Sequence, residues 1–179
     1  MFQFKALPLS GAFLITLPFF DDHRGNFTKT FQSHFFEQEN IGFELRESYF
    51  SFSHKDVIRG MHFQSPPHDH AKVVFCPQGS ILDVILDLRK ESSTYGQYYA
   101  TELSAANHHA YYIPKGFAHG FKALSEQAMT FYLVSSEHSK EHDTGIRYDS
   151  FGYDWNCPAP VLSERDLSFA GLPGFNSPF

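Results

Sequence analysis

The sequence predicts an all-β protein made of short strands arranged as a sandwich or a barrel. Segments with alternating apolar and polar residues, or with runs of Val, Ile and Leu, recur along most of the chain. Turns containing Gly or Pro separate these segments, and the periodicity of a helix is almost absent. The chain has 179 residues, of which 42% are hydrophobic, so it is long enough for one domain with a sizeable core.

The first third of the chain predicts short strands and one short helix. The expected strands are Leu14–Leu17, Phe27–Phe31 and Glu44–Ser53, with a polar turn at Asp21–Gly25. In the last of these strands, alternation places Glu47, Tyr49 and Ser51 on one face. Ser33 is the expected N-cap of a helix that runs to Asn40.

The central stretch, residues 58–79, predicts a strand, a turn and a second strand. It gathers Arg59, His62, His68, His70 and Lys72 between apolar residues. Burying charged groups costs several kcal/mol unless they are paired or used. Two interpretations therefore remain open for this stretch: an inward face that carries chemistry, or a solvated hairpin with histidines at the surface.

The second half of the chain predicts further strands and an irregular tail. The expected strands are Ser80–Leu88, Tyr98–Leu103, Tyr111–Ile113, Phe117–Ala123 and Met129–Val134. From about residue 141 the sequence becomes loop-like, and we expect this tail to wrap the barrel. Within it, Ser163 is the expected N-cap of one helical turn. The whole chain, 1–179, is expected to form a single domain.

Composition and charge exclude several classes of protein. The net charge of −6 argues against binding to nucleic acid, although one or two local arginines suffice for a phosphorylated small molecule. No apolar run approaches the ~18 residues of a transmembrane helix, and the first residues lack the basic opening of a signal peptide. Cys76 and Cys157 are too few for a disulfide framework, so we expect a cytoplasmic protein.

One interpretation of the histidines is a metal site. His68 and His70 are two residues apart, and His119 follows in a later strand, a spacing that resembles the metal sites of the cupin superfamily. The glutamate that usually follows the second histidine is replaced here by Ala71 and Lys72. Because lysine is a poor neighbour for a dication, a metal-dependent cupin enzyme is kept as the alternative hypothesis.

Eight short motifs occur in order between Phe20 and Asp166. They are Asp22–Phe27, Ile58–Gln64, Ala71–Val74, Asp83–Arg89, Tyr95–Gly96, Ile113–Phe121, Leu124–Glu126 and Leu162–Asp166. In their sequence, order and spacing they resemble the dTDP-4-dehydrorhamnose 3,5-epimerase family. The resemblance implies a cupin-type double-stranded β-helix, or jelly-roll barrel, with a few short helices, acting as a homodimer without metal or other cofactor.

The resemblance also implies a reaction on nucleotide-linked 4-keto-6-deoxy sugars. A proton next to the C4 ketone is removed, and the enolate is reprotonated from the opposite face. Such chemistry needs a base on one face, an acid on the other, and positive charge or donors near the developing oxyanion.

By this resemblance four residues are assigned to catalysis. His62 is the base, which suits an imidazole that titrates near neutrality. Asp166 orients His62, and Tyr132 is the acid on the far face. Lys72 lies beside the ketone oxygen and stabilises the enolate. The residue types alone leave plainer interpretations open: Tyr132 as core, Asp166 as a helix-start carboxylate without contact to His62, and Lys72 as an exposed edge-strand residue.

By the same resemblance other residues bind the substrate. Arg24 and Arg59 bind the diphosphate through charge-assisted hydrogen bonds, and His119 lines the sugar pocket. Gln64 closes the motif around His62 and is expected at the same site. Arg24, beside Gly25, also fits a simple turn residue.

The sequence departs from the family pattern at several of these positions. Lys29 replaces the usual glutamate, and Arg46, Glu47 and Ser48 stand where the family has Gln-x-Asn followed by serines. These positions face the nucleotide base in the family, so Lys29, Arg46 and Ser48 are expected at the site while the base stays open. His138 replaces a second tyrosine, which leaves open whether one or two centres are inverted. His70 replaces a glutamine.

The expected function is therefore cofactor-independent epimerisation at C3, C5 or both of a nucleotide-linked 4-keto-6-deoxyhexose. Its expected partners are this substrate and a second copy of the chain, with no nucleic acid and no membrane. The alternatives are the metal-dependent enzyme that uses His68, His70 and His119, or a non-catalytic protein that binds a sugar nucleotide.

Overall fold

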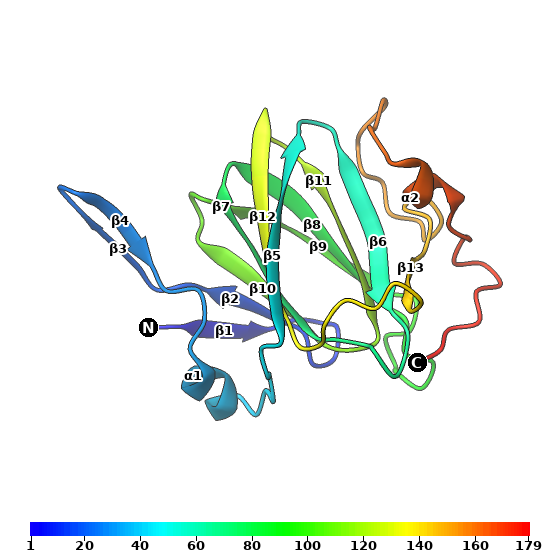
Figure 1. Cartoon of the computed structure of the whole chain (residues 1–179), viewed down its shortest axis with the longest axis horizontal. Coiled ribbons are helices and arrows are strands. Elements are labelled where there is room, and N and C mark those ends of the chain that lie inside the picture. The colour runs from blue at the N-terminus through cyan, green and yellow to red at the C-terminus, as the bar shows by residue number, and fades with distance from the viewer.

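Two antiparallel sheets face each other and enclose the core (Figure 1). The computed structural model describes the whole chain, residues 1–179. The six-stranded sheet has the order β1 (Gln3–Ala6), β2 (Phe13–Thr16), β10 (His109–Ile113), β7 (Lys72–Gln78), β12 (Gln127–Val134) and β5 (Glu47–His54). The five-stranded sheet has the order β13 (Asp143–Gly145), β6 (Ile58–Gln64), β11 (Phe117–Ala123), β8 (Ser80–Asp87) and β9 (Tyr98–Ser104).

From β5 to β8 and again from β9 to β12 the chain alternates between the two sheets, which gives the jelly-roll barrel that the family resemblance implies. The prediction of an all-β fold is confirmed. The core between the sheets is built from inward-facing residues of both, among them Ile81, Ile85, Tyr111 and Phe121, which are at most 1% exposed. Ile81 and Ile85 are four residues apart on β8, so both point to the same side of the sheet, as the period of two along a strand requires.

A hairpin of β3 (Phe19–Asp22) and β4 (Gly25–Thr28) stands away from the barrel (Figure 1). The expected strand at 27–31 therefore ends at Thr28, and Phe31 turns back to pack against Phe36 and Phe43. The hairpin pairs with no other strand of the chain.

Helix α1 (Ser33–Gln38) covers the outer face of the six-stranded sheet. Phe36 is its buried residue and packs against Phe2, Phe4 and Tyr112. The expected cap was wrong by one residue: Gln32 is the N-cap, its backbone is extended, and no side chain caps the helix. Ser33 is already inside the first turn.

The tail after residue 141 packs on the outer face of the five-stranded sheet. It adds β13 to the edge of that sheet and buries Ile146, Phe151 and Trp155. Helix α2 (Glu164–Ser168) begins at the expected N-cap, because the Ser163 side chain accepts a hydrogen bond from the Asp166 amide. Neither helix is long and apolar enough to cross a membrane.

Candidate active site

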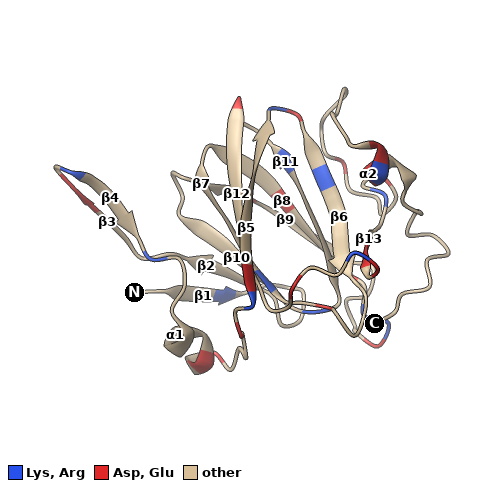
Figure 2. Ribbon diagram, in the orientation of Figure 1, with Lys and Arg blue, Asp and Glu red and all other residues tan.

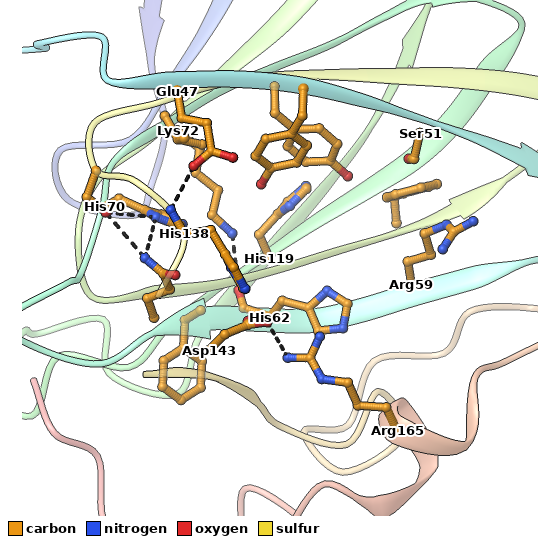
Figure 3. A pocket seen from close by; sticks show the side chains of 17 residues that line it. Glu47, Ser51, Arg59, His62, His70, Lys72, His119, His138, Asp143 and Arg165 are labelled. Atoms are coloured by element: carbon orange, nitrogen blue, oxygen red, sulfur yellow. Dashed lines mark hydrogen bonds and ion pairs between the residues drawn. The ribbon is translucent and has the colours of Figure 1, made fainter. Parts of the chain in front are cut away.

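A cavity of about 420 Å³ opens between the two sheets (Figure 3). Residues from β5, β6, β7, β11 and β12 line it, together with the loop after β12. Seven of the predicted site residues lie on its wall: Arg59, His62, Gln64, Lys72, His119, Tyr132 and His138. Of the polar residues of the central stretch, Arg59, His62, His70 and Lys72 thus face the cavity, whereas His68 is exposed.

His62 projects from β6 and forms a pair with Asp166. Its Nε2 lies 2.8 Å from Asp166 Oδ1, while Asp166 Oδ2 accepts a hydrogen bond of 3.1 Å from the Gly60 amide. Burial opposes ionisation of Asp166, but the bonds from His62 and Gly60 outweigh it and hold the pKa of the carboxyl below its usual value. An ionised Asp166 keeps a proton on Nε2 and leaves Nδ1 of His62 as the basic nitrogen.

Tyr132 enters the same cavity from the opposite sheet. It lies on β12 and is 8% exposed. Its ring stacks on Tyr49, with centroids 4.7 Å apart, and meets the edge of His119 at 5.8 Å. Burial raises the pKa of Tyr132 well above its ordinary value, so its hydroxyl keeps its proton at neutral pH.

Lys72 lies on β7, a central strand of the six-stranded sheet, and not on an exposed edge. It is 5% exposed, and its ammonium donates a hydrogen bond of 3.3 Å to the His62 carbonyl. Burial lowers the pKa of Lys72 to about 8, against the opposing charges of Asp143 and Asp83. A buried ammonium beside His62 is well placed to stabilise an oxyanion formed there.

His119 has a carboxylate partner that sequence reasoning missed. Its Nε2 lies 3.0 and 2.8 Å from the two oxygens of Asp83 on β8, and both residues are buried. Burial raises the pKa of Asp83 and lowers that of His119, because each charged form loses water. The available signal was an acidic residue in the middle of a strand otherwise rich in Ile, Leu and Val.

Arg59 and Gln64, at either end of β6, are held by the chain. Arg59 Nε donates to Ser53 Oγ at 2.9 Å, which fixes its guanidinium at the cavity wall. Both polar atoms of the Gln64 side chain bond to the backbone: Oε1 accepts from the Ser139 amide at 2.6 Å, and Nε2 donates to the His68 carbonyl at 2.8 Å. Gln64 thus braces the loop after β12 and offers little free hydrogen-bonding capacity to a ligand.

Four predicted binding residues lie outside the cavity of their own chain. Arg24 is exposed in the turn of the β3–β4 hairpin and pairs with Asp22. Lys29 follows the hairpin, Arg46 pairs with Glu44, and Ser48 is exposed. For Ser48 the cause is strand alternation, since its neighbours Glu47 and Tyr49 take the inward positions of β5. The expectation that these four line the site is not met within one chain.

Several wall residues were not assigned to catalysis or substrate binding by the family resemblance. They are Glu47, Tyr49, Ser51, His70, Ser136, Asp143 and Arg165. Alternation had placed the first three on one face of β5, which was the available signal. Asp143 and Arg165 form an ion pair of 2.8 Å between β13 and α2, a contact that joins two parts of the irregular tail.

The histidines of the alternative hypothesis do not gather. No group of three or more His, Cys, Asp or Glu side chains is arranged to hold a metal ion. His68 packs against His142, with ring centroids 4.4 Å apart, and His70 Nδ1 lies 3.2 Å from Ser136 Oγ. The two-residue spacing failed as an argument because residues 68–70 form a loop and not a strand.

A jelly roll with a His–Asp pair and a phenol on opposite walls of one cavity has the groups of a proton-transferring carbohydrate epimerase. The model of the family "dTDP-4-dehydrorhamnose 3,5-epimerase" matches residues 6–173, and the chain belongs to this family. The likeness to the family that the motifs carry is thereby confirmed.

Relatives and solved structures agree with this assignment. The chain is 35% identical to the dTDP-4-dehydrorhamnose 3,5-epimerase of Methanothermobacter thermautotrophicus, over 96% of this chain and 95% of that protein. It is 34% identical to a dTDP-4-dehydrorhamnose 3-epimerase of Streptomyces niveus, over 92% and 81%. The 3,5-epimerase of Legionella pneumophila, solved with dTDP-4-keto-L-rhamnose, superposes with a TM-score of 0.94 at 30% identity, covering 98% of this chain and 95% of that one.

Proposed function

We propose that this protein epimerises a nucleotide-diphosphate-linked 4-keto-6-deoxyhexose at C3, C5 or both, without a cofactor. The observation that carries the proposal is the placement of His62, which is paired with Asp166, and of Tyr132 on opposite sheets that wall one cavity. A sugar ring between them has a base on one face and an acid on the other. Membership in an epimerase family supports the same reaction, and the dTDP-linked substrates named for the relatives are the first to test.

The chemistry follows from these positions. His62 Nδ1 takes the proton from the carbon beside the ketone, the C–H bond breaks, and its electron pair moves onto the ketone oxygen. The Lys72 ammonium stabilises that enolate oxygen. The Tyr132 hydroxyl then gives its proton to the opposite face, which forms the new C–H bond and leaves a phenolate. Proton exchange with solvent returns His62 and Tyr132 to their starting states.

The two ends of the cavity carry different side chains, and this difference indicates where the diphosphate and the sugar of the substrate bind. Figure 3 shows Arg59 and Ser51 at one end and Lys72 and Glu47 at the other, with His62 between them. A guanidinium is suited to bidentate recognition of phosphate. We therefore place the diphosphate toward Arg59 and the keto sugar between His62 and Lys72.

We further propose that the working form is a homodimer. Phe20 and Phe27 on the projecting hairpin are 55% and 61% exposed, and Phe50 and Phe52 of the edge strand β5 are 55% and 50% exposed. Exposed aromatic surface of this kind marks contact with another chain. An interface formed by the hairpin brings Arg24 to a neighbouring cavity, which would explain why Arg24 is absent from its own.

We also place the protein in the cytoplasm. Cys76 and Cys157 are both free thiols, and Cys76 is buried. Free thiols and the absence of a disulfide framework suit a reducing compartment.

The experiment is a panel of dTDP-, UDP- and GDP-linked 4-keto-6-deoxy sugars read by NMR in D₂O. We expect deuterium at C3, C5 or both, with inversion, and the labelled carbons count the centres. His62→Ala should stop exchange at every centre. Tyr132→Phe should still exchange but lose inversion by about 10²–10⁴-fold, the range for a missing general acid.

Two exposed residues provide controls. His34→Ala and Tyr95→Phe lie away from the cavity and should leave exchange and inversion unchanged. A Tyr132→Phe enzyme with normal product would contradict the role of Tyr132. If no carbon of any sugar in the panel takes up deuterium, the chain is a sugar-nucleotide binding protein and not an epimerase.

A further inference from the structure

The ring of Tyr49 packs against the ring of Tyr132 on the wall of the cavity. The two residues are direct partners in the antiparallel pairing of β5 and β12. Their rings are 4.7 Å apart and within 22° of parallel, the geometry of a stacked pair. On the other side Tyr132 meets the edge of His119, which is itself fixed by Asp83. Tyr132 is thus held between one braced side chain and Tyr49.

The contact with Tyr49 is made by the ring and not by the hydroxyl. No hydrogen bond joins the Tyr49 hydroxyl to another group of the chain, while Tyr49 itself is 39% exposed on the edge strand. Burial, together with the charges of Glu47 and Asp143, raises the pKa of Tyr49 to about 12, so its ring faces the cavity as a neutral phenol. The partly exposed Tyr49 ring therefore covers one face of the Tyr132 ring, which is 8% exposed.

An enolate can be reprotonated on either face by whatever donor reaches it first. Inversion requires that the far-face donor be in place. With the phenol displaced, His62 exchanges its proton with solvent and returns a proton to the face from which it took one, giving exchange with retention. We propose that Tyr49 is a positioning residue that fixes Tyr132 by stacking and thereby makes the protein invert the centre it deprotonates. The inference rests on the proposed epimerase function and adds to it the residue that governs the outcome of each deprotonation.

The test compares Tyr49→Phe with Tyr49→Ala. Both variants are assayed in D₂O for the ratio of inverted product to substrate labelled with retention. Tyr49→Phe keeps the stacked ring and should keep this ratio within about twofold of the native value. Tyr49→Ala should shift it toward retention by roughly two- to tenfold, the factor that corresponds to an aromatic pair. Tyr95→Ala, which removes an equally exposed tyrosine from a loop outside the cavity, should leave the ratio unchanged.

Two results of this assay overturn the proposal. An unchanged ratio in Tyr49→Ala means that stacking does not position the acid. A loss in Tyr49→Phe as large as that in Tyr49→Ala means that the Tyr49 hydroxyl acts directly.

Crystal structures of the two variants give a readout that does not depend on activity. We expect one Tyr132 conformer in Tyr49→Phe and more than one in Tyr49→Ala. A Tyr132 ring that stays in a single position in Tyr49→Ala overturns the inference even if no substrate of the panel reacts. An inactive native protein would instead count against the proposed function alone.

Discussion

The Nε2 atom of His62 is bonded to Asp166, which leaves Nδ1 as the basic nitrogen. This arrangement predicts the effect of Asp166→Asn. An asparagine amide donates where the carboxylate accepted, so Nε2 becomes the acceptor and the proton moves to Nδ1. The basic nitrogen is then lost to the substrate. We expect kcat to fall by about 10²–10⁴-fold with the fold intact, measured by steady-state kinetics and circular dichroism. Asp149→Asn removes an exposed carboxylate paired with Arg147 and should have no such effect; equal kcat in Asp166→Asn and the native protein would contradict the role of Asp166.

The buried ammonium of Lys72 predicts an alkaline limb in the pH profile. With a pKa of about 8, Lys72 loses its proton as the pH rises through that value. If the charge stabilises the enolate, kcat/KM should fall above pH 8, and Lys72→Arg should move the fall to higher pH because arginine keeps its charge. A native profile that is flat between pH 7 and 9.5 would remove Lys72 from the mechanism.

The same pKa makes a separate prediction about stability. Between pH 8 and 10.5 the unfolded chain holds a proton on Lys72 that the folded chain has released, so stability rises with pH in this window. Below pH 8 the folded state bears the cost of the buried charge, and Lys72→Met should raise the free energy of unfolding at pH 7 by up to about 3 kcal/mol. The measurement is urea unfolding at pH 7, with Lys5→Met on the exposed edge of β1 as control. A destabilised Lys72→Met protein would show that the charge is already well compensated.

At the scale of elements, β6 and β11 approach so closely at Gly60 that a side chain does not fit. A Cβ on Gly60 would lie 2.5 Å from Gly120 Cα and 2.7 Å from the His119 carbonyl oxygen, and φ is +123°. A positive φ costs an L-residue roughly 1–2 kcal/mol, and overpacking typically adds 1–3 kcal/mol. Gly60→Ala should therefore lower stability by more than Gly152→Ala, whose φ is +80° in open space. Thermal unfolding of both variants decides this, and equal losses would mean that the strands separate freely.

Most strands were predictable because their residues report burial directly. The strand β8 is rich in Ile, Leu and Val, and β5 alternates in steps of two, so local sequence was enough. The first helix was placed well but capped wrongly, since a serine in the first turn looks like a cap until the backbone angles are known. The sequence does not show that the β3–β4 hairpin projects from the barrel, because the residues of its strands follow the same patterns as those of the strands inside the barrel.

The site residues that match the family could be predicted from the sequence. The contacts that depend on how the strands pair could not. The resemblance to the family pointed to His62, Tyr132 and Lys72, all of which line the cavity. The Asp83–His119 contact requires the pairing of β8 with β11, which no local pattern reveals. The spacing of His68 and His70 was misleading because residues two apart point to the same side only within a strand, and residues 68–70 form a loop.

At the scale of the whole molecule, the charges suggest that one chain is incomplete. Figure 2 shows basic residues on β6 and at the turn of the β3–β4 hairpin, two places far apart in the same chain. Within the cavity Arg165 is already paired with Asp143, which leaves Arg59 as the arginine available to a diphosphate. A diphosphate carries more charge than one guanidinium offsets, so a second arginine from a neighbouring chain would be expected there.

Mixed dimers test whether Arg24 serves the cavity of the partner. Arg24→Ala should raise KM by roughly 10- to 100-fold, the loss of a hydrogen bond to a charged group, and His62→Ala should be inactive. Co-expression with two affinity tags allows the dimer with one chain of each kind to be isolated.

If Arg24 acts across the interface, the Arg24→Ala chain has its own His62 and receives an intact Arg24 from its partner, so one of the two sites is complete. Assayed well below the native KM, this dimer should have about half the native activity, because symmetric dimers hold two equivalent sites. If Arg24 acts within its own chain, each site lacks one of the two residues and the mixed dimer will be no more active than the Arg24→Ala homodimer. A fully active monomer in analytical ultracentrifugation would contradict both the dimer and this use of the hairpin.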